Sequence, residues 1–323
     1  MTTAPSPQSA DPIVGRDAAT QHPEPETDRP YVWIDGQLLP KSEAKVSVFD
    51  HGLLYGDGCF EGIRVYNGAI FKAQSHLDRI FRNAEALHMM RQGDGFPYTK
   101  DQVLKIMEQC VEANGITEGY IRLIFTRGAG TLGLNPFKCE RPTVICIADT
   151  ITLYPPEMYT DGMRIIVAKR PRTPSACLDP MLKSLNYLNN ILAKVEAIDA
   201  DCLEAIMLST DGYVGECTGD NLFVVKDGEL FTSPIEVGML DGITREFVKS
   251  TLCPALSINC TEKRLTLDDV LAADEIFLTG SAAEIIAVTQ VDETIISDGE
   301  GPVTRQLREK FRAIVSSDNV PVD

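Results

Sequence analysis

Lys183 has the clearest potential for covalent chemistry in this sequence. It lies in an apolar, amide-rich stretch between Asp179 and Asn190, directly before an amphipathic helical pattern. Desolvation disfavours an ammonium ion, so a lysine in such surroundings offers a neutral amine that can form a Schiff base with a carbonyl compound. A surface lysine whose aliphatic stem packs along the chain is the ordinary alternative. The segment alone is compatible both with a Schiff-base lysine and with a surface lysine.

Two short glycine-containing segments are candidate anion sites. Gly242, Ile243 and Thr244 open a helical pattern with Thr244 near the N-cap, where free backbone N–H groups and the helix dipole attract anions. The segment Thr279 to Ala282 follows a predicted strand and precedes a predicted short apolar helix, so it offers a second set of amides. Each segment on its own could equally be an ordinary helix cap without an anion.

Two charged residues in apolar surroundings need partners. Arg64 ends the strand pattern that begins at Phe60, and a guanidinium there requires an anion, either a phosphate or a carboxylate of the chain. Glu216 stands beside small residues that lead into a further strand pattern, and it is either a functional acid or a turn cap. Spacing alone does not connect these residues with Lys183.

The elements that must position these residues form an α+β pattern in two parts. Hairpin signals at Asp35-Gly36 and Asn67-Gly68, two amphipathic helices and two further strands make up the first part. After a break at Pro155-Pro156, strands alternate with helices, the first of which begins near Asn186 and has its apolar residues on one face. We therefore predict a disordered tail at 1–30, a small α+β domain at 31–148, a linker at 149–158 and a larger domain at 159–323.

The segment Gly128 to Gly133 matches the glycine pattern of dinucleotide-binding folds, but its context argues against that function. A helix must open at the third glycine, whereas Asn135-Pro136 and Arg141-Pro142 interrupt any helix here. We predict a loop. The sequence has no phosphate-loop, serine-hydrolase or zinc-protease motif, and its four histidines lack metal-ligand spacing.

Composition excludes several classes of protein. A hydrophobic content of 44% and a net charge of -17 describe a soluble globular chain whose field repels nucleic acid and anionic lipid. No apolar run is long enough to span a bilayer, and the N-terminal residues lack the pattern of a signal peptide. The nine cysteines form no CxxC or Cys/His pattern, which favours free thiols. We expect a cytoplasmic protein without nucleic-acid or membrane partners and without a metal.

Several motifs, in their order along the chain, resemble those of the class IV pyridoxal-phosphate-dependent aminotransferases, most closely the branched-chain amino acid aminotransferases. The resemblance runs from about Tyr31 to the C-terminus, and a match to several motifs carries less risk of chance than a match to one. It implies the two-domain fold of that class, with a smaller N-terminal and a larger C-terminal domain. The motifs are Asp50 to Gly58, Phe60 to Arg64, Gly119 to Arg122, Lys183 to Asn190, Gly215 to Phe223, Leu240 to Arg245 and Thr279 to Ile285.

The resemblance implies pyridoxal 5'-phosphate as the cofactor, with a role for each site residue. Lys183 would be the catalytic residue, which binds the cofactor as a Schiff base and moves a proton between the substrate Cα and the cofactor. Glu216 would face the pyridine nitrogen, so that the ring acts as an electron sink, and Tyr187 would hydrogen-bond the phenolic oxygen. The residues implied for the phosphate are Arg64, Ile243, Thr244 and Ser281.

The same resemblance implies the substrate site and the reaction. Arg122 would meet the second carboxylate of glutamate or 2-oxoglutarate, at the rim of a pocket that otherwise takes an apolar side chain. The implied reaction is reversible transfer of the amino group of L-leucine, L-isoleucine or L-valine to 2-oxoglutarate, through pyridoxamine phosphate. The residues implied for the substrate carboxylate and side chain are Tyr120, Ser281, Ala282, Tyr55, Phe60 and Gly62.

Other functions of the same fold stay open. A D-amino acid aminotransferase would place an arginine and a histidine in the loop Gly128 to Arg141, which contains no histidine. An aminodeoxychorismate lyase uses the same cofactor, and a non-catalytic binding protein could keep the fold, although Lys183 and Glu216 are both present. The resemblance also implies a homodimer or a larger homo-oligomer, with the segment around Tyr55 reaching the neighbouring subunit.

Overall fold

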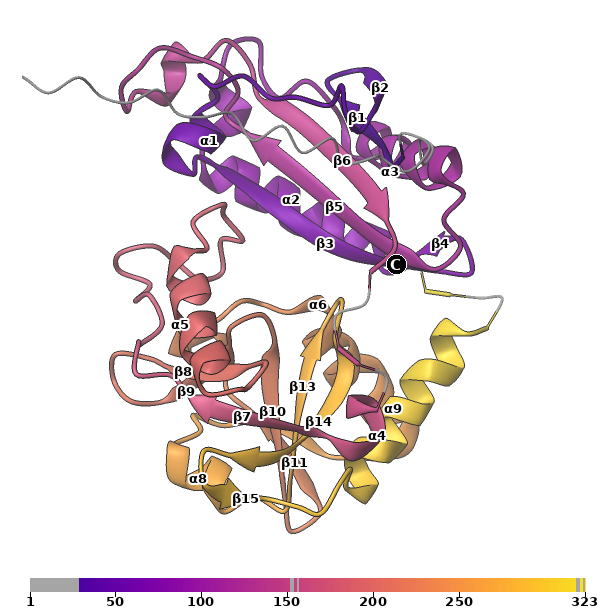
Figure 1. Cartoon of the computed structure of the whole chain (residues 1–323), viewed down its shortest axis with the longest axis vertical. Helices are drawn as coiled ribbons and strands as arrows, with labels where there is room; N and C mark the ends of the chain where they lie inside the picture. The colour runs from indigo at the N-terminus through magenta and orange to yellow at the C-terminus, as the bar shows by residue number, and fades with distance from the viewer. Residues whose placement is uncertain (1–28, 152–153, 156, 318–319, 322) are drawn as a thin grey trace, which may run out of the picture.

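The computed structural model describes residues 29–151, 154–155, 157–317, 320–321 and 323. Its strands form two separate sheets, one from Tyr31 to Asp149 and one from Met163 to Ile295 (Figure 1). Of the predicted tail only Arg29 and Pro30 are described, and part of the predicted linker also lies outside the described residues. Within the described residues, no helix is both long and apolar enough to cross a membrane.

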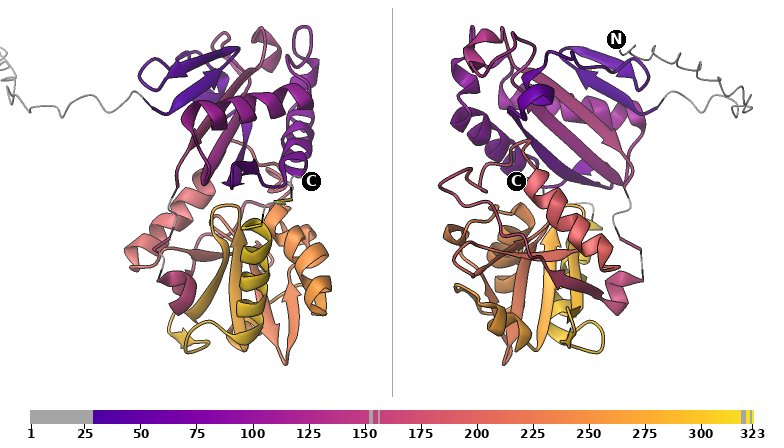
Figure 2. Two further views of the ribbon diagram at one scale, coloured as in Figure 1. Left: turned by 90° about the vertical axis from the view of Figure 1, so that its right-hand side faces the viewer. Right: turned by 60° about the vertical axis from the view of Figure 1, so that its left-hand side comes forward.

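The first sheet is antiparallel and has helices packed on one face (Figures 1 and 2). Its strand order is β2-β1-β6-β5-β3-β4. Leu77 and Ile80 of one helix and Val103 and Met107 of the next pack with Ile121 of the sheet in a single core. The elements are β1 (Tyr31–Ile34), β2 (Gln37–Pro40), α1 (His51–Tyr55), β3 (Gly58–Tyr66), β4 (Ala69–Ile70), α2 (Ala73–Ala86), α3 (Lys100–Asn114), β5 (Gly119–Thr126) and β6 (Thr143–Asp149).

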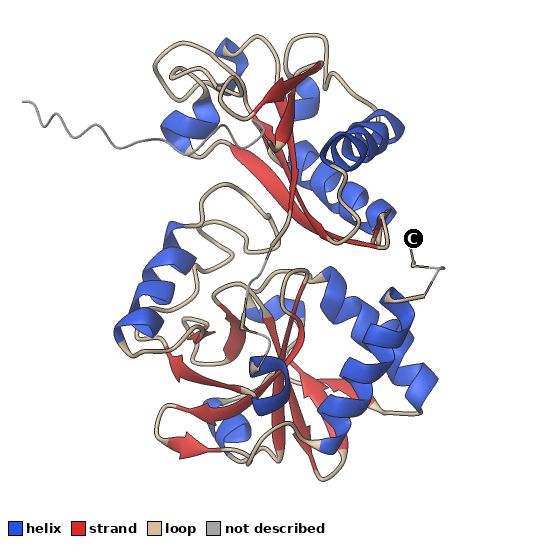
Figure 3. Ribbon diagram, turned by 45° about the vertical axis from the view of Figure 1, so that its right-hand side comes forward, coloured by secondary structure: helices blue, strands red, loops and turns tan. Residues whose placement is uncertain are grey.

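The second sheet has mixed strand directions and lies below the first in Figure 3. Its strand order is β12-β11-β10-β13-β14-β7-β8-β9, with β15 paired to β14. The strands are β7 (Met163–Val167), β8 (Ala205–Leu208), β9 (Val214–Cys217), β10 (Asn221–Lys226), β11 (Glu229–Thr232), β12 (Cys260–Glu262), β13 (Glu275–Gly280), β14 (Glu284–Val291) and β15 (Thr294–Ile295). The helices are α4 (Met158–Asp161), α5 (Leu188–Asp199), α6 (Ile243–Phe247), α7 (Cys253–Leu256), α8 (Leu267–Leu271) and α9 (Pro302–Val315).

Strand β10 shows why the centre of the second sheet is a continuous apolar run in the sequence. Successive side chains of a strand point to opposite faces, and both faces are covered here. Leu222 and Val224 join the core on one face, whereas Phe223 and Val225 join the core on the other. Phe71, from the first part of the chain, enters the second of these cores, so the two parts share it.

The sequence predicted a short helix after Ala282 and a loop at Gly128 to Gly133, and the first of these predictions was wrong. The predicted short helix after Ala282 is the strand β14, because Ile285 to Val288 pairs antiparallel with β13. Thr279 and Gly280 therefore end β13, and Ser281 and Ala282 lie in the turn of a hairpin and not at the start of a helix. The segment Gly128 to Gly133 contains no helix, in agreement with the predicted loop.

Helix α5 places its predicted apolar face toward solvent. Its buried residues are Asn190, Ala193 and Ala197, which are small or polar. Small side chains let α5 lie close to β8. The exposed apolar residues of the helix are Leu188, Ile191, Leu192, Val195 and Ile198.

Candidate active site

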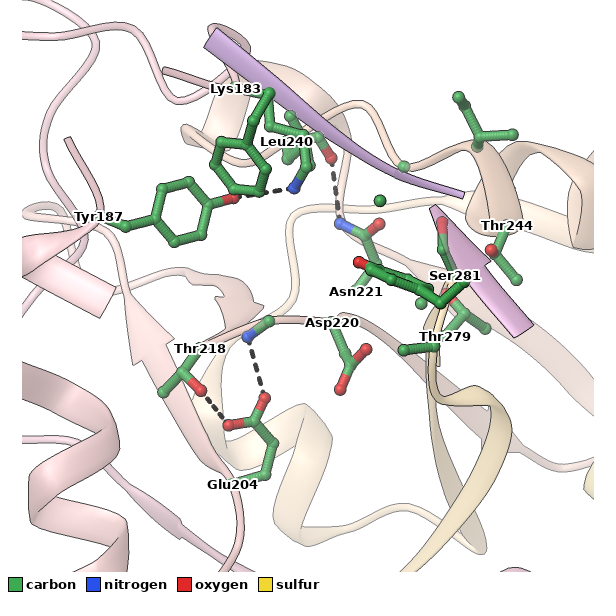
Figure 4. Close-up of a pocket in the computed structure, with 18 of the residues that line it drawn as sticks. Lys183, Tyr187, Glu204, Thr218, Asp220, Asn221, Leu240, Thr244, Thr279 and Ser281 are labelled. Carbon is green, nitrogen blue, oxygen red and sulfur yellow. Dashed lines mark hydrogen bonds between the residues drawn. The ribbon is translucent and has the colours of Figure 1, made fainter. Parts of the chain in front are cut away.

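A cavity of about 260 Å³ has walls from both parts of the chain. The second part contributes Lys183 and Tyr187, the connection between β9 and β10, the start of α6 and the turn between β13 and β14 (Figure 4). The first part contributes residues of β3, α2 and β5. The cavity therefore exists only when the two sheets are assembled. The predicted site residues that line it are Phe60, Gly62, Tyr120, Arg122, Lys183, Tyr187, Ile243, Thr244, Ser281 and Ala282.

The backbone of β3 holds Lys183 in position. Phe60 N donates to Lys183 O at 3.0 Å, and Leu185 N donates to Gly58 O at 2.9 Å, so this segment pairs with the strand from the other part of the chain. The Lys183 side chain is half-buried, and its Nζ donates to Tyr187 Oη at 2.9 Å (Figure 4). The same Nζ lies 4.7 Å from the centre of the Phe60 ring. An amine and a phenol are thus fixed together in the cavity wall.

The end of the cavity at α6 contains an arginine that the sequence analysis missed. Arg79 of α2 lines the cavity beside Gly242, Ile243 and Thr244, and its Nη1 donates to Asp241 O at 2.6 Å. The sequence could have indicated Arg79, because it falls on the buried face of α2, where a charged residue needs a partner of opposite charge.

Arg64, the arginine predicted for the phosphate, does not line this cavity. Its Nη2 lies 3.5 Å from Glu284 Oε1, and its guanidinium carbon lies 4.9 Å from the centre of the Tyr66 ring. The sequence left two partners open for Arg64, a phosphate and a carboxylate of the chain. The structure pairs it with a carboxylate of the chain.

Glu216 is buried behind the cavity wall and is absent from the lining residues. Its Oε1 accepts from Arg172 Nε at 2.6 Å, and its Oε2 accepts from the backbone N–H of Leu240 at 3.0 Å. Leu240 itself lines the cavity. The structure therefore places this predicted acid directly beside a residue that lines the cavity, but not among the lining residues themselves.

Two other carboxyl groups, which sequence reading did not select, do line the cavity. Glu204 accepts from the N–H of Gly219 at 3.0 Å and from the hydroxyl of Thr218. Asp220 accepts from Tyr154 Oη at 3.1 Å. Burial and the nearby Glu204 charge raise the pKa of Asp220 to about 7. This wall therefore holds a carboxyl group that titrates near neutral pH.

The wall formed by β3 and β5 combines aromatic rings with one cation. The guanidinium carbon of Arg122 lies 4.6 Å from the centre of the Phe60 ring, and Arg122 Nη2 donates to Tyr120 Oη at 3.5 Å. A Cβ atom on Gly62 would lie 1.7 Å from Tyr120 Oη, so only glycine leaves room for this ring. Tyr55 lies elsewhere: it is exposed, and its Oη accepts from Gly133 N at 2.9 Å.

Comparison with known proteins identifies the family. Residues 58–291 match the family described as amino-transferase class IV. The chain belongs to the class IV aminotransferases. The family predicted from the sequence motifs, and its fold with two sheets of mixed α/β content, are therefore confirmed.

Named relatives of this class IV aminotransferase cover nearly the whole chain. A protein of Methanocaldococcus jannaschii, provisionally named a branched-chain-amino-acid aminotransferase, is 44% identical over 284 residues, which are 88% of this chain and 96% of that protein. A solved structure of the T.th. branched-chain amino acid aminotransferase with pyridoxamine 5'-phosphate has a TM-score of 0.83 and 34% identity, covering 88% of this chain and 94% of that one. A D-alanine aminotransferase of Staphylococcus epidermidis is 30% identical over 291 residues, 90% of this chain and 99% of that protein.

Proposed function

We propose that this class IV aminotransferase transfers the amino group of L-leucine, L-isoleucine or L-valine to 2-oxoglutarate, with pyridoxal 5'-phosphate as cofactor. The observation that carries the proposal is Arg122, whose guanidinium lies on the Phe60 ring in the same cavity as Lys183. A guanidinium among aromatic side chains suits a cavity that takes an apolar side chain in one half-reaction and a carboxylate in the other. The names of the relatives at 44% and 34% identity support the same substrate class.

The donor groups at one end of the cavity fit a phosphate. Arg79, the first amides of α6 and the turn at Ser281 lie together there. Thr279 Oγ1 is buried at the same wall with no hydrogen-bond partner among the described residues, and a phosphate oxygen would supply one. A Cβ atom on Gly242 would lie 1.8 Å from Asn221 Oδ1, so glycine is required where the backbone approaches this end.

The opposite end of the cavity supplies the reactive amine. When bound, pyridoxal phosphate supplies an electron sink for negative charge at the substrate Cα. Lys183 Nζ is the group available to hold the cofactor and to take and return the Cα proton, and Tyr187 Oη orients it from 2.9 Å. Glu216 stays our candidate partner for the pyridine nitrogen, because it is the acid that the Arg172 ion pair and the Leu240 N–H hold against the cavity wall.

The decisive experiment adds L-leucine, or D-alanine, to the cofactor-loaded enzyme and follows its visible absorbance and the formation of 2-oxo acid. We expect L-leucine alone to bleach the band and 2-oxoglutarate to restore it. Lys183→Ala should lower the rate at least about a hundredfold, because the proton-transfer group is lost. Lys169→Ala, an exposed lysine outside the cavity, is the matched control.

Other outcomes of this experiment would contradict the proposal. Bleaching by D-alanine alone would assign the enzyme to the D-amino acid branch, to which one relative of 30% identity belongs by name. A protein that forms no visible band after addition of the cofactor would be a binding protein of this fold. Elimination without transamination would indicate a lyase.

Arg122→Leu tests the observation that carries the proposal. The variant keeps an apolar contact with Phe60 but removes the cation that would meet the second carboxylate. We expect kcat/KM for 2-oxoglutarate to fall about a hundredfold and that for L-leucine to change only about twofold. Equal losses for both substrates would show that Arg122 has no selective role.

We also propose that the enzyme is a homo-oligomer. The apolar face of α5 is exposed in the single chain, as are Phe49, Leu53 and Leu134 near α1 and the loop after β5. Apolar side chains gathered in this way usually mark an interface. Ile191→Glu should lower the mass measured by light scattering, whereas Ile295→Glu, at an exposed apolar residue of β15, should not. An unchanged mass for Ile191→Glu would contradict a role for α5.

We propose the cytoplasm as the compartment. All nine cysteines are free, and most are buried, a state that suits a reducing environment. Cell fractionation with antibody detection tests this placement, and recovery of the enzyme in an oxidising compartment would contradict it.

A further inference from the structure

Arg79 is held by a buried acid and a buried histidine. Glu61 of β3 is fully buried, and its two carboxylate oxygens accept from Arg79 Nε at 2.7 Å and from Arg79 Nη2 at 2.8 Å. His76 Nδ1 lies 2.7 Å from Glu61 Oε2. His76 and Arg79 are three residues apart on α2 and share its buried face, so both reach the same carboxylate.

The protonation states of this cluster follow from its charges. Burial alone would raise the pKa of Glu61, but the Arg79 guanidinium and His76 hold it well below its usual range. Burial lowers the pKa of His76. At neutral pH, Glu61 is therefore a carboxylate that can only accept hydrogen bonds, and the neutral His76 ring must donate from Nδ1. The hydrogen bond thus fixes the tautomer of His76.

The same bonds leave part of Arg79 free to bind an anion. Nε and Nη2 donate to Glu61, and Nη1 donates to Asp241 O. One N–H on each terminal nitrogen is then without a partner among the described residues. Arg79 lines the cavity together with Ile243 and Thr244, at the end that we propose for the phosphate. A guanidinium fixed along one edge binds an oxyanion with a defined orientation.

We propose that His76 is a positioning residue for anion binding, which orients Glu61 and through it the Arg79 guanidinium that meets the cofactor's phosphate. The inference rests on the proposed function, because the phosphate is that of pyridoxal phosphate. Without the Nδ1–H donor, Glu61 Oε2 would lose one of its two partners in a site closed to water. The carboxylate could then turn, and Arg79 would turn with it.

The test compares two ligands that differ only in the phosphate. The cofactor-free full chain is titrated with pyridoxal 5'-phosphate and with pyridoxal, for the wild type and for His76→Leu. We expect His76→Leu to bind pyridoxal phosphate about tenfold more weakly and its affinity for pyridoxal to change by less than about twofold. His76→Asn, whose amide can donate to Glu61, should restore most of the loss.

Controls separate positioning from packing. Ile80→Val removes one methyl group from the same buried face of α2 and should leave the preference for the phosphate unchanged. Should His76→Leu not fold, His76→Gln replaces it, since its longer amide cannot keep the place of Nδ1, and the same selective loss is expected.

Three results distinguish the two claims. Equal weakening of both ligands in His76→Leu, or no weakening, would overturn the inference. If the wild type transaminates L-leucine and His76→Leu keeps its full preference for the phosphate, the inference fails and the proposed function stands. If the wild type itself does not prefer pyridoxal phosphate over pyridoxal, both fail.

Discussion

Two buried carboxyl groups beside the cavity have pKa values that are shifted in opposite directions. Glu61 is fully buried and Asp220 is 6% exposed, so both lose nearly all contact with water. The pKa of Glu61 lies well below its usual range, whereas the pKa of Asp220 is raised to about 7. Burial raises the pKa of both groups, and their partners decide the outcome.

The partners differ in charge. Glu61 has a bidentate guanidinium and an imidazole against it. Asp220 has one neutral donor, the Tyr154 hydroxyl, while the nearby cation Lys194 pairs with Glu204 at 3.3 Å. The first part of the chain thus presents a fixed cation to the cavity, and the second part presents a group able to carry a proton. Removing partners one at a time tests this difference.

Glu61→Gln should have the largest effect. It leaves the Arg79 guanidinium buried without its counterion, a loss that typically costs about 3 to 5 kcal/mol of unfolding free energy. Below about pH 4.5 the wild type should begin to lose the same stabilisation, because a group with a depressed folded pKa contributes stability that is lost progressively as the pH falls from its unfolded pKa towards its folded pKa. Urea unfolding of the cofactor-free chain at pH 7 and pH 3.5 measures both. A loss under about 1 kcal/mol at pH 7 would mean that burial of Arg79 needs no counterion.

Asp220→Asn should stabilise the protein above neutral pH, whereas Glu61→Gln destabilises it. With a folded pKa of about 7 against an ordinary 3.8, wild-type Asp220 binds more protons when folded, so stability falls as pH rises between these values. The slope of one such group is about 1.4 kcal/mol per pH unit. We expect Asp220→Asn to remove this slope and to be more stable than the wild type at pH 8 but not at pH 4. Parallel stability curves for the two proteins would contradict the raised pKa.

Tyr154→Phe should have a smaller effect. It removes the hydroxyl that donates to Asp220 Oδ2 but keeps the ring. We expect a loss of about 1 kcal/mol at pH 8, where the carboxylate needs the donor most, and a further rise in the pKa of Asp220. In the Asp220→Asn background the loss should shrink, and a full loss there would show that the two side chains act independently.

Asp274→Asn should have the smallest effect and serves as the exposed control. Asp274 pairs with Lys226 at 2.9 Å, and both side chains are about half exposed. Exposed pairs contribute little to the free energy of unfolding, because water and salt screen their attraction. If Asp274→Asn lost as much unfolding free energy as Glu61→Gln, burial would not explain why some of these charge pairs matter more than others.

Residues that act within one short segment could be predicted from the sequence. Lys183 and Tyr187 are four residues apart in one motif, and the structure brings their side chains to 2.9 Å. Gly242 to Thr244 likewise lies in one turn and lines the cavity, while its binding of an anion stays a prediction. In both cases the local chain geometry suffices, because the groups are joined by a few bonds.

The choice between Arg64 and Arg79 could not be made in this way. Arg64 shares the face of β3 with Phe60 and Gly62, which line the cavity, but lies two residues further along, where Glu284 meets it. Arg79 reaches the cavity from α2 because Glu61, on the opposite face of β3, holds it. Each arginine is a cation among apolar residues of its own element, Arg64 on a strand and Arg79 on a helix, and only the packing of strand on helix shows which of them reaches the cavity.

The sequence by itself determined the family, the fold class and the local motifs around Lys183, because these depend on residue types and spacings along the chain. The tertiary structure decided which charges face one another, as in the pairing of Arg79 with Glu61 and of Arg172 with Glu216. It also decided that the apolar face of α5 is exposed. The physical reason is that periodicity shows which side chains share a face, whereas electrostatic interaction and burial depend on distances between residues far apart in the chain.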